Sequence, residues 1–100
     1  MKRELIKSPG FIRDLRRWSK MHPRTLAEVE ATLLALAEDA RQPALRTHKL
    51  KGNLSAYWTC SGGYDVRVMF EFITHGGEEA ILLHGIGTHD DIYQTGGTGA

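Results

Sequence analysis

The spacing of hydrophobic residues in the first half of the chain is helical. A first apolar stripe recurs at i, i+4 and i+7 and consists of Phe11, Leu15 and Trp18. Ser8 and Pro9 stand before this stripe, and serine is a preferred N-cap while proline fits the first helical position. The pattern predicts a first helix that ends near the Met21-His22-Pro23 segment. Another side of this helix carries the basic residues Arg13, Arg16, Arg17 and Lys20.

A second helix is predicted to begin at about Pro23 and to end before Gln42-Pro43, because proline cannot continue a helix. Its apolar positions keep helical spacing and are Leu26, Val29, Leu33 and Leu36. Alanines between these positions favour the helix and permit close packing. The short link between the two helices predicts an αα-hairpin. The linker that follows, residues 41–53, is rich in basic side chains.

From Leu54 onward the period changes to two, which is the period of a β-strand. The turn sequences Ser61-Gly62-Gly63 and His75-Gly76-Gly77 separate three predicted strands, since glycine accepts positive φ without steric cost. The middle strand, residues 64–72, alternates most clearly between apolar and polar side chains. The last strand contains the continuous apolar run 80–83, which is consistent with burial on both sides.

Residues 2–7 add a short predicted edge strand ahead of the first helix. The order is therefore an N-terminal strand, a two-helix hairpin and a three-stranded antiparallel meander. Helices packed on one sheet face are the stable arrangement for this order, so we predict an α+β fold. A chain of 100 residues forms one domain, which we place at residues 1–93, and we expect residues 94–100 to be a flexible tail.

Charge is divided unevenly along the chain, although the net charge is only +1. Residues 1–51 hold twelve Lys/Arg and six Asp/Glu, a balance of +6, whereas residues 52–100 hold one and six, a balance of −5. This asymmetry fits either a basic surface for nucleic acid or a solvated helix face.

The sequence also predicts a compartment. The single cysteine, Cys60, precludes an internal disulfide, fits a reducing environment and follows the inward parity of its strand. No apolar run approaches the ~20 residues of a membrane helix, and the N-terminus lacks the apolar stretch of a secretory signal. We therefore expect a cytoplasmic protein that does not associate with membranes.

One face of the predicted middle strand is polar. Because successive side chains of a strand point to opposite faces, Asp65, Arg67 and Glu71 should share the face away from the helices. The plain interpretation is a solvated sheet face with scattered charges. The segments 48–52 and 85–93 lead into and out of the same sheet, and they bring His48 and His89 toward this face.

These residue types suit the cleavage of RNA at a phosphodiester. Arginine and lysine bind phosphate oxygens, and histidine shuttles protons near neutral pH. A base would take the proton of the ribose 2′-OH, that oxygen would attack phosphorus, and an acid would protonate the leaving 5′-oxygen. Base stacking could be supplied by Tyr57, Trp58 or Tyr93.

Metal binding is a weaker interpretation. The spacing of His84 and His89, followed by Asp90 and Asp91, could hold a metal ion. No CxxC or HExxH motif accompanies it, and we expect neither a metal nor another cofactor.

Three segments resemble the RelE/ParE superfamily of toxin–antitoxin toxins, nearer to its RelE/StbE and YafQ-like mRNA interferases than to its gyrase-poisoning ParE branch. The similar order of elements covers residues 1–93. The matching segments are His48-Lys49-Leu50-Lys51-Gly52, Tyr64-Asp65-Val66-Arg67-Val68-Met69-Phe70 and Gly87-Thr88-His89-Asp90-Asp91-Ile92-Tyr93.

The resemblance implies an activity, metal-independent cleavage of mRNA in the ribosomal A site, and it implies residue roles. His89 would be the leading acid–base residue with His48 second, and Arg67 would stabilise the phosphate. Asp65 and the aromatic Tyr93 match further catalytic positions of such toxins. Lys51 would dock the substrate, with Lys49 beside it.

The resemblance also implies a protein antitoxin as partner. The protein would contact operator DNA only through this antitoxin. Two other functions stay open. One is a ParE-like toxin that inhibits gyrase by binding, without nuclease chemistry, and the other is an inert member kept as a partner-binding module. The polar face with flanking histidines favours the nuclease.

Overall fold

A computed structural model describes residues 2–63 and 65–92 and confirms the predicted α+β fold. Among these residues no helix is long and apolar enough to cross a membrane. The two helices are α1 (Pro9–Met21) and α2 (Leu26–Glu38). The strands are β1 (Glu4–Lys7), β2 (His48–Lys49), β3 (Trp58–Gly62), β4 (Val66–His75) and β5 (Glu78–Gly87). The residues 64 and 93–100, which include Tyr64, Tyr93 and the predicted tail, lie outside the description.

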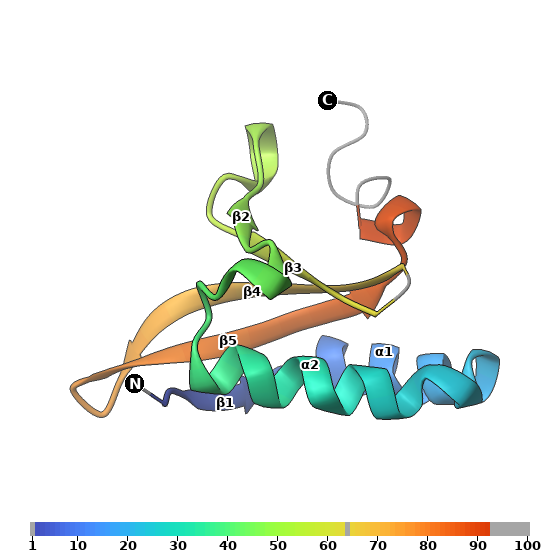
Figure 1. Cartoon of the computed structure of the whole chain (residues 1–100). Coiled ribbons are helices and arrows are strands. Elements are labelled where there is room, and N and C mark those ends of the chain that lie inside the picture. Colours follow the sequence, from blue (N-terminus) through green and yellow to red (C-terminus); the bar gives the residue numbers. More distant parts are fainter. Residues whose placement is uncertain (1, 64, 93–100) are drawn as a thin grey trace.

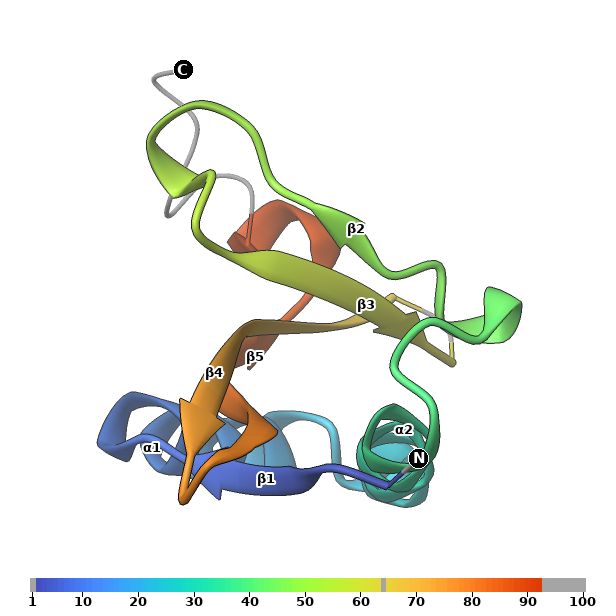
Figure 2. The ribbon, with the colours of Figure 1, turned by 90° about the vertical axis from the view of Figure 1, so that its left-hand side faces the viewer.

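The strands form one sheet in the order β1-β5-β4-β3-β2, with both helices on the same face (Figures 1 and 2). The predicted meander corresponds to β3, β4 and β5, which pair antiparallel. The predicted N-terminal strand pairs parallel to β5 and closes one edge. Beyond the prediction, the basic linker contributes the two-residue strand β2, which pairs with β3 at the other edge.

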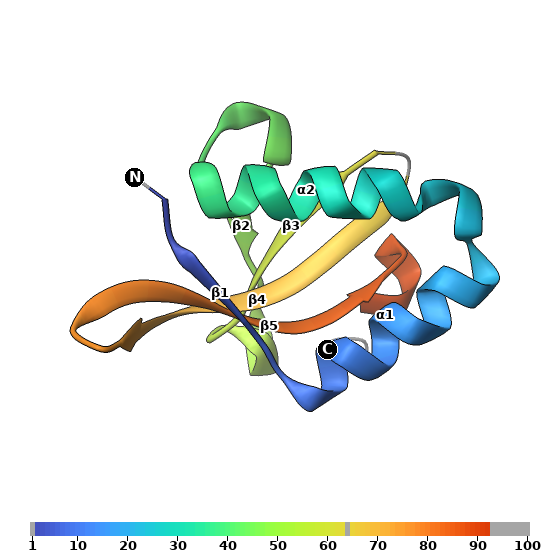
Figure 3. The same cartoon turned by 90° about the horizontal axis from the view of Figure 1, so that it is seen from below.

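Helix α1 begins where the sequence predicts. The Ser8 hydroxyl oxygen accepts a hydrogen bond from the Phe11 amide at 3.1 Å, and proline occupies the first turn. The start of α2 differs from the prediction, because Pro23–Thr25 form a 3-10 turn and α2 begins only at Leu26. From this turn the two helices diverge along the sheet in a V (Figure 3).

The first meander strand is shifted from its predicted position. Residues 52–54 form a 3-10 turn, so the alternation from Leu54 does not mark a strand until Trp58. Ser61 and Gly62, predicted as a turn, instead end β3. A Cβ at Gly62 would lie 1.7 Å from the Thr32 hydroxyl oxygen, so glycine here permits close contact between β3 and α2 rather than a turn.

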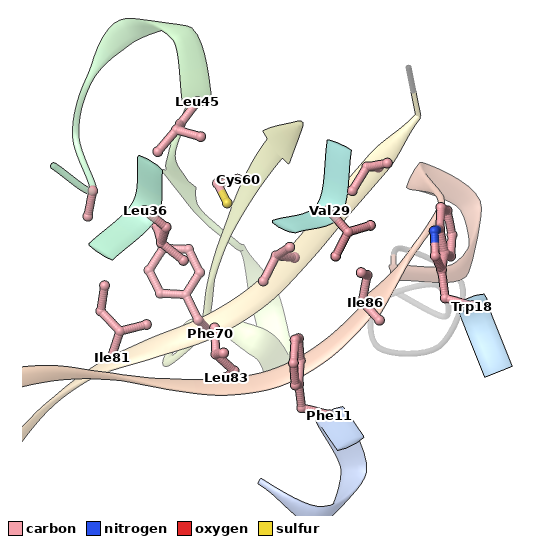
Figure 4. Packing of buried hydrophobic residues seen from close by; sticks show 13 residues of the cluster. Phe11, Trp18, Val29, Leu36, Leu45, Cys60, Phe70, Ile81, Leu83 and Ile86 are labelled. Atoms are coloured by element: carbon pink, nitrogen blue, oxygen red, sulfur yellow. The ribbon is translucent and has the colours of Figure 1, made fainter. Parts of the chain in front are cut away.

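The hydrophobic core lies between the helices and the sheet (Figure 4). Phe70 of β4 is fully buried, as are Phe11 of α1 and Leu36 of α2. The predicted burial of residues 80–83 on both sides holds only in part, since Ala80, Ile81 and Leu83 are buried while Leu82 is half-buried. The core therefore covers one face of the sheet, and the other face carries Arg67 and Glu71 beside the half-buried Met69 and Leu82.

Cys60 is part of this core, and its burial gives a chemical prediction. Burial raises the pKa of the Cys60 thiol from 9.0 to about 12. The thiolate is the reactive form, so the native protein should resist a disulfide reagent at pH 8. We expect labelling to be slower than in urea by roughly 10³-fold or more, because it requires opening of a stable domain. Native labelling as fast as in urea would contradict the buried position.

Candidate active site on the exposed sheet face

Arg67 marks the polar face of the sheet. Its neighbours Val66 and Val68 are fully buried in the core, and alternation turns Arg67 to the opposite face, where it is half-buried. The guanidinium Nη1 donates to the Val66 carbonyl at 3.2 Å, so the side chain folds back toward the start of β4. Ser61 and Gly87 lie directly opposite Arg67 on the two adjacent strands.

Asp65 lies near the start of β4, but in a conformation that the sequence pattern did not predict. We predicted a strand residue, but β4 begins at Val66 and Asp65 occupies a turn with a φ of 59°. The Asp65 carboxylate Oδ1 accepts a hydrogen bond from the His89 backbone amide at 3.1 Å. The turn, rather than strand alternation, therefore joins Asp65 to the segment that carries His89.

His89 lies in a short helical turn that follows β5. The Thr88 amide donates to Asp91 Oδ2 at 3.0 Å, and the Asp91 amide donates to the Thr88 hydroxyl at 3.1 Å. This reciprocal pair is a capping box, which fixes the start of the turn. The His89 side chain is 56% exposed, with Nδ1 at 3.7 Å from Asp90 Oδ1. The backbone of His89 is thus held on both sides while its imidazole faces solvent.

His48 lies on β2, opposite Thr59 of β3. Its Nδ1 is 2.9 Å from the Arg46 carbonyl oxygen. A carbonyl only accepts, so Nδ1 carries the proton of that hydrogen bond and Nε2 is the basic nitrogen of the neutral ring. Arg46 holds a left-handed conformation with a φ of 50°, which directs its carbonyl to the imidazole.

A cleft of about 810 Å³ brings several of these residues together. Asp65 and Arg67 line it from the sheet, and Arg46 lines it from the linker before β2. The opposite wall comes from α2 and includes Glu28. Arg46 was not predicted as a site residue, because its only signal in the sequence is its place in the basic linker.

Comparisons with known proteins now bear on this arrangement. No protein-family model matches the chain, and no curated protein matches it in sequence. Several solved structures match its fold, and three of them come from different bacteria. The YoeB/ParE toxin from Agrobacterium tumefaciens has a TM-score of 0.69 at 15% identity, covering 86% of this chain and 98% of that one. A chain of the DinJ-YafQ complex from E. coli has a TM-score of 0.68 at 17% identity, covering 92% and 99%. The toxin-antitoxin complex RelBE2 from Mycobacterium tuberculosis gives 0.67 at 16%, covering 89% and 100%.

The chain has the RelE/YafQ-like fold. This confirms the fold that the sequence resemblance implied. At such low identity the likeness establishes the path of the chain, and the chemistry must be argued from the side chains of this protein.

Within the RelE/YafQ-like fold, His48 and His89 approach the exposed face from opposite sides. Strands β3 and β4 lie between β2 and β5, and both β2 and the turn with His89 stand on the side of the sheet away from the helices (Figure 1). The two segments that carry these histidines therefore lie on opposite sides of β3 and β4.

Other predicted residues are not brought to the cleft. Lys49 lies opposite Trp58 and alternates with His48, so its side chain starts on the other face of the sheet. Lys51 is exposed and precedes a 3-10 turn, outside the cleft lining. The Trp58 ring packs against the Arg41 guanidinium, 4.8 Å from its centroid, rather than toward the cleft. Tyr93 lies outside the described residues.

The metal site that the spacing of His84 and His89 could have formed has no counterpart among the described residues. Among residues 2–63 and 65–92, no three His, Cys, Asp or Glu side chains form a group that could hold a metal ion. His84 instead places Nε2 at 2.7 Å from Glu71 Oε2.

Proposed function

We propose that this protein is the toxin of a toxin–antitoxin pair. We further propose that it acts as an endoribonuclease on mRNA in the ribosomal A site. The observation that carries the proposal is that Arg67 and Asp65 line one cleft and that the Asp65 carboxylate holds the backbone amide of His89. A fixed cation, a fixed carboxylate and an exposed imidazole are the groups that metal-independent phosphodiester cleavage requires.

In the proposed reaction a base removes the proton of a ribose 2′-OH, and the 2′-oxygen attacks the adjacent phosphorus. His48 Nε2 suits this role, because Nδ1 is committed to the Arg46 carbonyl. Arg67 stabilises the charge that develops on the phosphate oxygens. As the bond from phosphorus to the 5′-oxygen breaks, His89 donates a proton to that oxygen. The products are a 2′,3′-cyclic phosphate and a 5′-hydroxyl end.

Asp65 is proposed to position His89. Its carboxylate holds the His89 amide, so it fixes the backbone from which the imidazole projects. Lys51 and Tyr93 remain proposals for substrate contact.

The proposed partner is an antitoxin protein. Two of the similar structures are complexes, RelBE2 and DinJ-YafQ, and the first is described as a toxin-antitoxin complex. For this chain we propose a partner of the same kind, which would neutralise the toxin in the cytoplasm and link it to operator DNA.

Induced expression in cells tests the proposal. We expect growth arrest together with new mRNA 5′ ends inside codons, detected by primer extension. Arrest with a DNA-damage response and without new ends would favour a ParE-like gyrase inhibitor. Neither arrest nor new ends would leave only a partner-binding role.

A further inference from the structure

A second hollow, also about 810 Å³, lies outside the residues assigned above. We call it the α1 groove, because α1 forms one wall with Arg13, Asp14, Arg17 and Met21. Met69 and Ile86 of the sheet line it, and Ile92 contributes from the turn that carries His89. The remaining wall comes from Leu54 and Tyr57, which lie before β3. Its volume falls in the range of roughly 300–1,000 Å³ that is typical of small-ligand sites.

A β-bulge shapes one side of the α1 groove. Met69 lies opposite Gly85, but the next residue, Phe70, lies opposite Leu83, so His84 is the extra residue of β5. The bulge turns the His84 ring to the polar face, where Nε2 lies 2.7 Å from Glu71 Oε2. An ionised carboxylate only accepts, so Nε2 carries the proton and the ring orientation is fixed.

Tyr57 completes an aromatic wall. Its ring meets the His84 ring edge to face, with centroids 4.8 Å apart and an interplanar angle of 75°. Both side chains line the α1 groove. Two held rings beside the half-buried Met69 side chain make a surface on which a planar heterocycle can pack.

The charged side chains around the α1 groove differ in whether they can bind a ligand. Asp14 Oδ2 accepts from the Ile86 amide at 3.3 Å, and its Oδ1 accepts from Arg17 Nη2 at 3.3 Å. Asp91 accepts from the Thr88 amide. The acids are thus bonded within the protein, whereas the Arg17 side chain remains 67% exposed. Among the described residues, the Arg13 guanidinium makes no hydrogen bond or ion pair, which leaves it available to an anion.

We propose that the α1 groove binds a nucleotide of the RNA substrate beside the cleaved bond, with its base on the Tyr57–His84 wall and its phosphate at Arg13 and Arg17. The inference rests on the proposed ribonuclease function. Continuity supports it, since Ile92 lines the groove and His89 belongs to the same helical turn. A strand that crosses this turn would contact both sites.

Direct binding to a short fluorescein-labelled single-stranded RNA tests the inference. The parent protein carries His89→Ala, so that the RNA stays intact during anisotropy measurements. We expect Tyr57→Ala to weaken binding by about 10-fold, which is typical of losing one base stack, and Tyr57→Phe to restore it. The double change of Arg13→Ala and Arg17→Ala should weaken binding by about 10-fold or more.

Arg16→Ala is the matched control. Arg16 is exposed on the same helix and carries the same charge, but it does not line the α1 groove. Equal losses for Arg13→Ala, Arg16→Ala and Arg17→Ala, or unchanged binding by Tyr57→Ala, would overturn the nucleotide site. Circular dichroism would show that each variant is folded.

If the wild type cleaves mRNA while the groove variants bind RNA normally, only this inference fails. A groove that instead takes a protein segment would give that result. If the wild type produces no new mRNA ends in cells, the proposed function fails first.

Discussion

Replacing His89 with alanine should lower the rate of mRNA cleavage by roughly 10²–10⁴-fold, which is the usual contribution of one general acid or base. The protein should remain folded, because the side chain is 56% exposed and its removal leaves the backbone bond to Asp65 in place. An exposed substitution of this kind changes the free energy of unfolding by about 0.5 kcal/mol or less. The measurement is the cleavage rate on mRNA in programmed ribosomes, with the melting temperature recorded beside it.

His75→Ala is the matched control for this prediction. His75 is exposed at the end of β4, far along the strands from Arg67 and Gly87. It removes the same imidazole and should leave the cleavage rate unchanged. Equal rates for His89→Ala and the wild type would remove His89 from the mechanism, whatever the fold resemblance implies.

Replacing Phe70 with alanine should destabilise the fold by about 3–5 kcal/mol, the usual cost of truncating a buried phenylalanine. Phe70 is fully buried between the helices and the sheet, and its ring meets the Phe72 ring at a centroid distance of 5.3 Å. Since small domains are stable by about 5–15 kcal/mol, this one change would remove a large share of the total. Urea unfolding followed by circular dichroism measures it.

Ile12→Ala provides the comparison on the surface of α1. The Ile12 side chain is 40% exposed, so its truncation should cost much less than that of Phe70. If both variants lost similar stability, the face that we describe as the core would not be the one that holds the domain together.

The two helices were predictable because their signals are local. The Ser8 cap and the i, i+4, i+7 stripe act within α1 itself, and the structure reproduces both. The strand limits were less predictable. Leu54 has the right parity for β3, yet the chain turns there and pairs only from Trp58, because pairing depends on β4 rather than on local preference.

The candidate site was predictable in composition but not in assembly. Strand alternation correctly predicted that the Arg67 side chain points away from the core. Asp65 comes near His89 through a left-handed turn, and alternation holds no information on such a turn. Arg46 lines the cleft through a long-range approach of the linker, and the bulge that turns His84 outward depends on the register between β4 and β5.

The proposed function requires that this chain cleave RNA through the ribose 2′-OH, beside Arg67 and His89. The most direct measurement uses purified wild-type protein and programmed ribosomes, with two mRNAs that differ by a single 2′-deoxy substitution at the mapped cleavage site. We expect the unmodified mRNA to be cut to a 2′,3′-cyclic phosphate end and the substituted mRNA to stay intact at that position. Equal cleavage of both mRNAs, or a product with a 5′-phosphate, would contradict it.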